Sequence, residues 1–108
     1  MIKVAISRSN NRITSFEISG HADSGPYGYD LVCAGVSAIS FGLINAIHEL
    51  CVVELDIEQG SEGGYLYVGI PPLLPDGQEH NVQLLLQGML ISLQTIEHEY
   101  GNFLKILQ

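Results

Sequence analysis

Hydrophobic residues in this chain change their spacing from every second position to every third or fourth position, and this change happens twice. Alternation at every second position is typical of half-buried strands, and the longer spacing is typical of amphipathic helices. The predicted elements are strands at residues 2–6 and 13–19, a helix at 31–51, strands at 53–58 and 66–70, a helix at 79–100 and a strand at 103–107. The order ββαββαβ predicts an α+β fold, with two helices packed on one face of a mostly antiparallel sheet.

Length and composition favour a single folded domain over residues 1–108. Hydrophobic residues make up 46% of the chain and charged residues 15%, which supplies a core and excludes intrinsic disorder. The apolar run at residues 1–6 is too short for a signal peptide. The longest apolar stretch is interrupted by Gln83, Gln87, Ser92 and Gln94, so we expect no segment of the ~20 residues that a bilayer requires. The sequence therefore predicts a soluble, cytoplasmic protein.

The net charge of −8 restricts the partners of this domain. Twelve acidic residues stand against four lysines and arginines. So acidic a surface repels phosphate backbones, which excludes nucleic acid as an expected partner. The charge suits a basic protein partner, although it also serves solubility alone.

The two cysteines, Cys33 and Cys51, are expected to be free thiols. If one helix joins them, eighteen residues place them ~27 Å apart at 1.5 Å per residue. A disulfide needs Cα atoms within ~7 Å. Two unpaired thiols suit a reducing compartment, and Cys51, at the apolar end of the helix, is expected to be inert packing.

A candidate catalytic pair lies where the second predicted strand ends and the first predicted helix begins. His21 follows the strand, and Cys33 is expected in the first turn of the helix, which it occupies if Asp30 is the N-cap. Unpaired N–H groups at a helix N-terminus stabilise a thiolate and the oxyanion of an acyl-transfer intermediate, and a neighbouring imidazole accepts the thiol proton. This pattern predicts Cys33 as nucleophile and His21 as general base.

Three further residues are predicted to support this pair. Asp30 either caps the helix or orients the imidazole of His21, and the sequence leaves both roles open. Ser37 lies four residues after Cys33, on the same helical face. Gly20, beside His21, permits a close approach of backbone or substrate.

The segment at residues 20–37, GHADSGPYGYDLVCAGVS, resembles the signature of the ribosomal-processing cysteine protease family, Prp. The likeness covers essentially the whole chain and includes the segment LISLQTIE at residues 90–97. It implies a cytosolic, dimeric protease without a cofactor, in which a Cys–His dyad removes a short N-terminal extension from a large-subunit ribosomal protein. By position the dyad is Cys33 and His21, with Gly20, Asp30 and Ser37 in supporting roles.

The loop predicted between the second strand and the first helix carries two tyrosines, Tyr27 and Tyr29. In the family that the chain resembles, aromatic residues precede the cleaved bond. We expect the loop at residues 22–29 to close over an extended apolar peptide, with Tyr27 and Tyr29 stacked on those aromatic side chains. The alternative is that both are ordinary loop residues.

Two other kinds of function are compatible with parts of this sequence. A metal site formed by His21, Asp23, Asp30 and Cys33 lacks the closely spaced ligand pairs that zinc sites usually show, so no metal is expected. A non-catalytic acidic adaptor that binds a basic ribosomal or assembly protein needs no reactive thiol. The remaining histidines, His48, His80 and His98, are expected to be surface or cap residues.

A second apolar stripe is predicted on the helix at residues 79–100. Leu84 and Ile91 point away from the main apolar arc, with Gly88 between them. A second copy of the chain would cover this stripe, and the alternative is that both are stray exposed residues.

Overall fold

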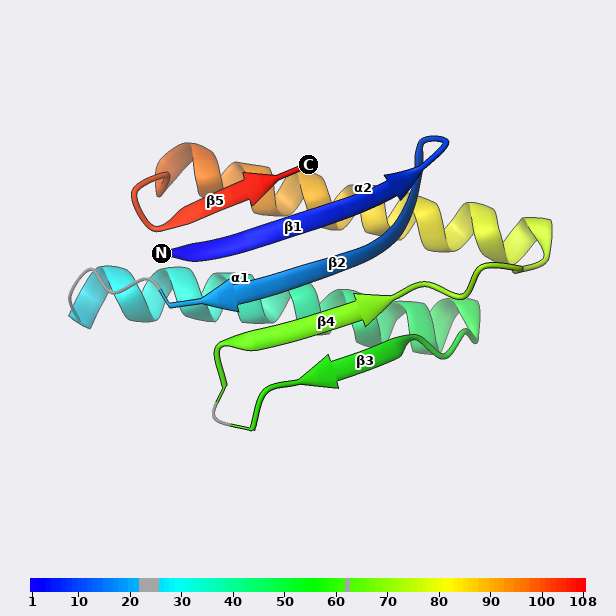
Figure 1. Ribbon diagram of the computed structural model, residues 1–108, viewed down its shortest axis with the longest axis horizontal. Coiled ribbons are helices and arrows are strands. Elements are labelled where there is room, and N and C mark those ends of the chain that lie inside the picture. The colour runs from blue at the N-terminus through cyan, green and yellow to red at the C-terminus, as the bar shows by residue number, and fades with distance from the viewer. Residues whose placement is uncertain (22–25, 62) are drawn as a thin grey trace.

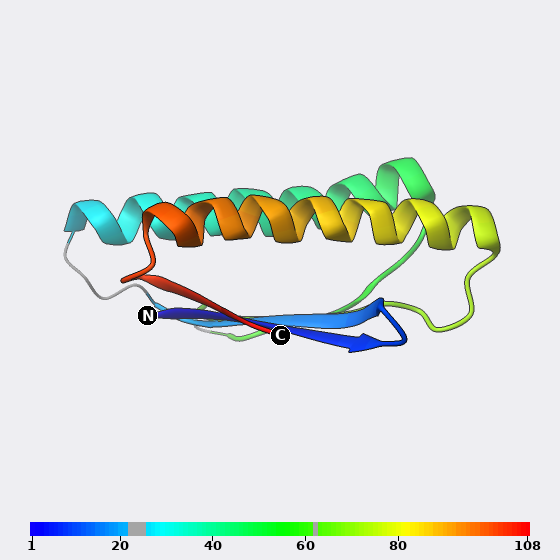
Figure 2. The same ribbon diagram turned by 90° about the horizontal axis from the view of Figure 1, so that it is seen from above.

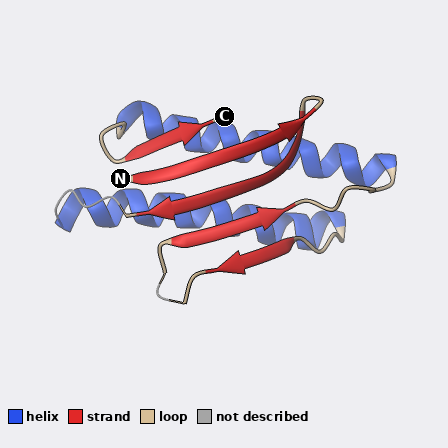
Figure 3. Cartoon of the chain, in the orientation of Figure 1, coloured by secondary structure: helices blue, strands red, loops and turns tan. Residues whose placement is uncertain are grey.

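In the computed structural model, which describes residues 1–21, 26–61 and 63–108, five strands form one mixed sheet (Figure 1, Figure 3). In chain order the strands are β1 (Ile2–Ser9), β2 (Arg12–Gly20), β3 (Asp56–Gln59), β4 (Tyr65–Gly69) and β5 (Leu104–Leu107). Their order across the sheet is β3-β4-β2-β1-β5. The described pairs are antiparallel except for β1 and β5, which are parallel.

Two long helices among the described residues cover one face of this sheet (Figure 2). They are α1 (Pro26–Ala46), continued by the short π-helical segment η1 (Ile47–Cys51), and α2 (Asp76–Glu99). The view from above shows both helices in a single layer on the same side of the strands. The predicted α+β fold and the order ββαββαβ are confirmed.

The core lies between the sheet and the helices. Residues paired across neighbouring strands, such as Val4 with Ile18 and Phe16 with Val68, share the covered face. Phe16 and Val68 are completely buried. The helices contribute the buried residues Val32, Val36, Leu43, Ile47, Val82, Leu86, Met89, Leu90 and Leu93. The alternation in the strands and the helical spacing in α1 and α2 therefore direct the same apolar faces toward one another.

The β1–β2 hairpin depends on two asparagines. Asn10 and Asn11 have φ values of 52° and 67°, and Ser9 pairs with Arg12 across the turn. Two-residue hairpin turns that match the twist of the strands need positive φ, which asparagine tolerates better than most residues. This tight turn fixes the register that brings the end of β2, Gly20, opposite Ile2.

Several predicted boundaries differ from the structure by three residues or more, and two of them have a clear physical reason. The helix α1 begins at Pro26, five residues before Leu31. Proline is favoured at the first helical position because its missing N–H would have no partner there and its φ already suits a helix. The strand β3 begins only at Asp56, paired with Gly69. Pro71 and Pro72 follow shortly after β4, and they have no N–H group with which to extend the ladder.

The expectation about membrane-length segments also needs correction. The helical stretch Leu31–Cys51 has 21 residues and a mean hydropathy of 1.7, which by length and composition is enough to cross a bilayer. In this fold it is a helix of the sheet-covering layer, with Val32, Val36 and Ile47 in the core. Its high hydropathy arises because residues 31–47 contain no charged side chain.

Candidate active site

A cavity of about 450 Å³ lies between α1 and the end of the sheet at which β2 finishes and the β3–β4 turn lies. Among the described residues, its wall includes His21 and Cys33. The other lining residues are Ile2, Ile18, Gly20, Val36, Ser37, Ser40, Phe41, Gln59, Gly60, Gly63, Gly64, Tyr65 and Leu66. The structure thus brings together four of the predicted site residues: Gly20, His21, Cys33 and Ser37.

His21 is held by its backbone at the end of β2. The amino group of Met1 donates a hydrogen bond to the carbonyl oxygen of His21. The preceding Gly20 has a φ of 88°, and a Cβ there would overlap the carbonyl oxygen of Met1. The N–H of Gly20 donates to the carbonyl oxygen of Gly64, at 2.9 Å. Gly20 therefore allows the close backbone approach that the sequence predicted, and the partner is the chain's own first residue.

Cys33 lies in the interior of α1 and not in its first turn. It is the eighth residue of a helix that begins at Pro26, about two turns from the N-terminus. Only the first four N–H groups of a helix lack intrahelical partners, and the dipole effect fades within the first turn. The prediction that free first-turn N–H groups surround Cys33 is wrong. Its side chain is half-buried and packs against the core.

Asp30 occupies the fifth position of α1, so it does not cap the helix at Leu31. It precedes Cys33 by three residues, which places both positions on one side of the helix. The side chain of Asp30 lies outside the described residues, as do those of Tyr27 and Tyr29 and all of residues 22–25. Tyr27 and Tyr29 belong to α1, so the prediction that both lie in a loop is wrong. The closure over a substrate and the orienting role of Asp30 stay predictions.

The comparison with known proteins decides the family. The family described as cysteine protease Prp matches residues 1–105. The chain belongs to this family. The match covers the cavity with both of its candidate catalytic residues, Cys33 and His21.

Relatives and solved structures agree over nearly the whole length. The ribosomal processing cysteine protease Prp of Bacillus subtilis is 43% identical over 107 residues, covering 98% of this chain and 96% of the relative. The Staphylococcus aureus protein of the same name is 41% identical, covering 98% and 97%. Two crystal structures of the S. aureus protease match this chain. The structure with a covalently linked product peptide matches with a TM-score of 0.87, and the structure with a substrate peptide matches with a TM-score of 0.84. The first is 41% identical and covers 99% of this chain and 98% of that one. The second is 40% identical and covers 98% and 97%.

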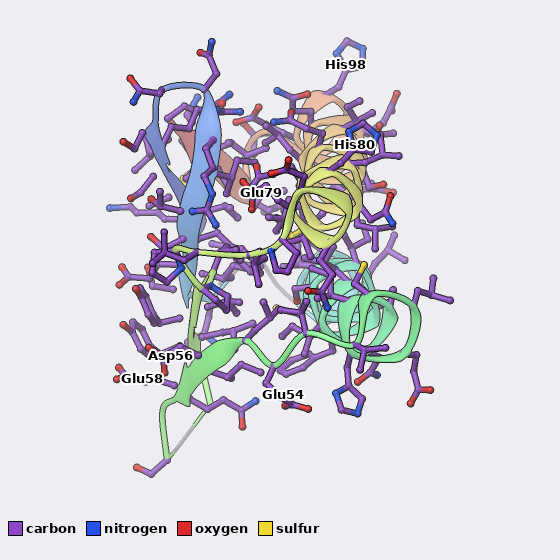
Figure 4. All side chains as sticks on the ribbon, turned by 90° about the vertical axis from the view of Figure 1, so that its right-hand side faces the viewer. Glu54, Asp56, Glu58, Glu79, His80 and His98 are labelled. Carbon is purple, nitrogen blue, oxygen red and sulfur yellow. The ribbon has the colours of Figure 1, made fainter. Side chains whose placement is uncertain are left out.

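The chain is therefore a cysteine protease of the Prp family, and not the non-catalytic adaptor that its charge alone allowed. Its two cysteines differ in position: Cys33 lines the cavity, whereas Cys51 is 6% exposed and belongs to the core. His48, His80 and His98 are exposed and do not line the cavity, and Figure 4 shows His80 and His98 projecting from α2.

Two serines of α1 face the cavity with different surroundings. Ser37, predicted as a supporting residue, is exposed and lies one turn after Cys33. Ser40, which the sequence did not single out, is 1% exposed, and its hydroxyl donates to the carbonyl oxygen of Val36 at 2.8 Å. That donor is used inside the helix, so Ser37 is the better placed of the two to meet a substrate.

The wall opposite α1 was also missed by sequence reasoning. Gly60, Gly63 and Gly64 come from the β3–β4 turn, some 40 residues after His21 in the chain. The available signal was the pairing of β4 with β2, which sets Tyr65 beside Ser19 and so brings the preceding turn next to His21.

The Tyr65 hydroxyl donates to Glu17 at 2.9 Å, and this hydrogen bond raises the pKa of the phenol, with the charges of Glu17 and Glu58 adding to the shift.

Among the described residues, no group of three or more histidine, cysteine, aspartate or glutamate side chains is placed to hold a metal ion. Two of the four possible metal ligands in the sequence, Asp23 and the side chain of Asp30, lie outside the described residues. The expectation that the site works without a metal therefore stays a prediction.

Proposed function

We propose that this protease removes a short N-terminal extension from a large-subunit ribosomal protein, with the Cys33 thiolate as nucleophile and His21 as general base. The observation that carries the proposal is the shared cavity: Cys33 and His21 are the cysteine and the histidine that line it. The relatives in Bacillus subtilis and Staphylococcus aureus bear the name of ribosomal processing proteases, which supports the substrate class.

The proposed reaction proceeds in two halves. His21 accepts the proton of the Cys33 thiol, and the thiolate attacks the scissile carbonyl carbon to form a C–S bond. His21 then returns the proton to the leaving amine as the C–N bond breaks, which leaves a thioester on Cys33. Water attacks the thioester with His21 again as base, and the thiol is restored. Because Cys33 lies inside α1, the dipole of the helix contributes little to the activation of its thiol. The imidazole of His21 therefore contributes more of that activation than it would if Cys33 lay at a helix N-terminus.

The cavity wall favours apolar substrate side chains. Ile2, Ile18, Phe41 and Leu66 line it, and no lysine or arginine is found among its described lining residues. An extended peptide with aromatic residues before the cleaved bond, as the family resemblance implies, would bury those side chains against this wall. The acidic surface of the domain complements the basic body of a ribosomal protein.

We expect a substrate peptide to lose cleavage when the aromatic residues before its cut are replaced by aspartate. Burial of an unpaired carboxylate costs several kcal/mol, so the rate should fall by about 10²-fold or more. Synthetic N-terminal peptides of large-subunit ribosomal proteins, incubated with the protein and read by mass spectrometry, give both the cleavage site and this rate. A matched leucine substitution should be tolerated. Equal cleavage of the aspartate and leucine peptides, or cleavage of none of the extended peptides, would overturn the substrate proposal.

We also propose that two copies pair through the outer face of α2. Leu84 and Ile91 are 62% and 63% exposed, and a Cβ at Gly88 between them would meet no atom within 4 Å in the part of the chain that the structure describes. Residues 81–96 contain no charged side chain in a chain of net charge −8, so this face is one on which two copies meet without repulsion.

Leu84→Glu is expected to weaken the dimer by at least about tenfold, because it places like charges opposite each other where apolar area was buried. Sedimentation equilibrium across a concentration series measures the shift. Leu73→Glu is the matched control, since Leu73 is 92% exposed and lies outside the helices. A wild-type protein that sediments as a monomer, or that binds phospholipid vesicles through this face, would contradict the pairing.

We propose a cytoplasmic location. Both cysteines are free thiols in the structure, which suits a reducing compartment. Fractionation of cells followed by immunoblotting should place the protein in the soluble fraction. Recovery in the membrane fraction would instead assign a membrane role to the apolar stretch Leu31–Cys51.

A further inference from the structure

The imidazole of His21 rests against a residue without a side chain. A Cβ built on Gly64 would lie 2.6 Å from Nε2 of His21 and 2.9 Å from its Cε1. Real Cβ atoms do not approach that closely, so any side chain at position 64 displaces the ring or the turn. Gly64 has a φ of 73°, which also favours glycine.

The turn that carries Gly64 is held from two sides. The Gly64 carbonyl oxygen accepts the N–H of Gly20 at 2.9 Å, so the residue before His21 and the residue facing its ring are joined directly. Within the turn, the N–H of Gly60 donates to the carbonyl oxygen of Tyr65 at 3.1 Å. Because the backbone on both sides is tied, the imidazole is the part that must give way if Gly64 acquires a side chain.

We propose that Gly64 is a positioning residue that keeps the His21 imidazole inside the cavity with Cys33. The proposal rests on the role of His21 in the proposed function, and it adds that the β3–β4 turn forms the surface on which the ring is set. A misplacement of about 1 Å in a catalytic group costs about 10²-fold in rate. The site therefore depends on a residue distant in sequence from the signature segment.

The chain supplies a matched control for this proposal. Gly63 has a φ of 77°, close to that of Gly64, but a Cβ there would meet no atom of the described residues within 4 Å. Gly63→Ala and Gly64→Ala thus impose similar backbone strain, and only the second adds an atom against the His21 ring. Any difference between the two variants reports the contact and not the strained backbone.

Gly64→Ala is expected to lower kcat by about 10²-fold with KM little changed. Gly63 also lines the cavity, but its Cβ would not meet the His21 ring, so Gly63→Ala is expected to lower kcat at least about tenfold less than Gly64→Ala. Both should lower the melting temperature by a similar amount. The rate of Cys33 alkylation by iodoacetamide, measured against pH, should move to higher pH in Gly64→Ala alone, because the displaced imidazole assists the thiol less. Equal loss of kcat in both variants, or loss in neither, would overturn the proposal.

If the alanine variants fail to fold, Gly64→Asn and Gly63→Asn provide the same comparison, because asparagine tolerates positive φ and still carries a Cβ. His21→Ala, assayed alongside, separates the two proposals. Wild-type cleavage by His21→Ala would refute the dyad itself, and with it any positioning role. Inactive His21→Ala together with fully active Gly64→Ala would refute the positioning role and leave the dyad standing.

Discussion

Replacement of Cys33 by alanine or serine is expected to abolish peptide cleavage while the fold is kept. Loss of the nucleophile in a protease costs about 10⁶-fold in kcat. A serine hydroxyl is a far weaker nucleophile than a thiolate, and among the described lining residues the imidazole of His21 is the one base available to activate it. Cleavage of an extended ribosomal-protein peptide, followed by mass spectrometry, gives the rate. Because Cys33 is only half-buried, either variant should melt near the wild-type temperature.

The second cysteine supplies the control. Cys51 is buried in the core at the end of η1, so Cys51→Ala should keep full cleavage and lose about 1 kcal/mol of unfolding free energy. Cleavage at the wild-type rate by Cys33→Ala would show that Cys33 is not the nucleophile, and an inactive but folded Cys51→Ala would show that Cys51 is more than inert packing.

The parts of the fold that could be predicted from sequence are those that depend on hydrophobic spacing. The alternation at Ile2, Val4 and Ile6 and at Phe16 and Ile18 identifies two strands and the face that each buries. The helical spacing of Val36, Leu43 and Ile47 identifies the buried side of α1 in the same way. Hydrophobic spacing indicates which side chains are buried in the core. The core here is formed by one layer of sheet packed against one layer of helices, so the spacing predicts both layers.

The start of α1 could not be predicted in that way. Glycines and a proline at residues 25–28 are typical of a loop, but Pro26 is also well suited to the first helical position, and the helix begins there. Gly28 costs about 1 kcal/mol inside a helix. That cost is small against the packing of a 21-residue helix on the sheet, so tertiary contacts override the local preference. Because the start of α1 was predicted five residues too late, Cys33 was expected at the helix terminus, whereas it lies in the helix interior.

Only part of the candidate site could be predicted from the sequence, again because tertiary contacts decide the rest. His21 and Cys33 lie in one short segment with recognisable neighbours, so a local reading finds them. Gly64 meets His21 only because β4 pairs with β2 in a register that sets Tyr65 opposite Ser19. That register follows from the packing of the whole sheet, which no local pattern around the β3–β4 turn specifies.

A second exposed histidine provides the control that distinguishes a catalytic role of His21 from a general effect of losing a histidine. His21→Ala is expected to lower kcat by about 10²- to 10⁴-fold, the usual contribution of a general base. His48 is exposed and pairs with Glu54 at 2.7 Å outside the cavity, and such surface pairs contribute about 1 kcal/mol or less. His48→Ala should therefore cleave at the wild-type rate, and both variants should melt like the parent protein.

Chelator distinguishes general-base chemistry from a metal site at the same residue. A proton transfer between Cys33 and His21 needs no ion, so the wild-type rate should be unchanged in excess EDTA. In a metal site, loss of His21 and removal of the ion would act alike, and zinc would restore the chelated enzyme. Activity that disappears with chelator and returns with zinc would therefore overturn the dyad, even if His21→Ala were inactive. Chelator-resistant cleavage that fails only in His21→Ala and in the Cys33 variants assigns the chemistry to the two side chains themselves.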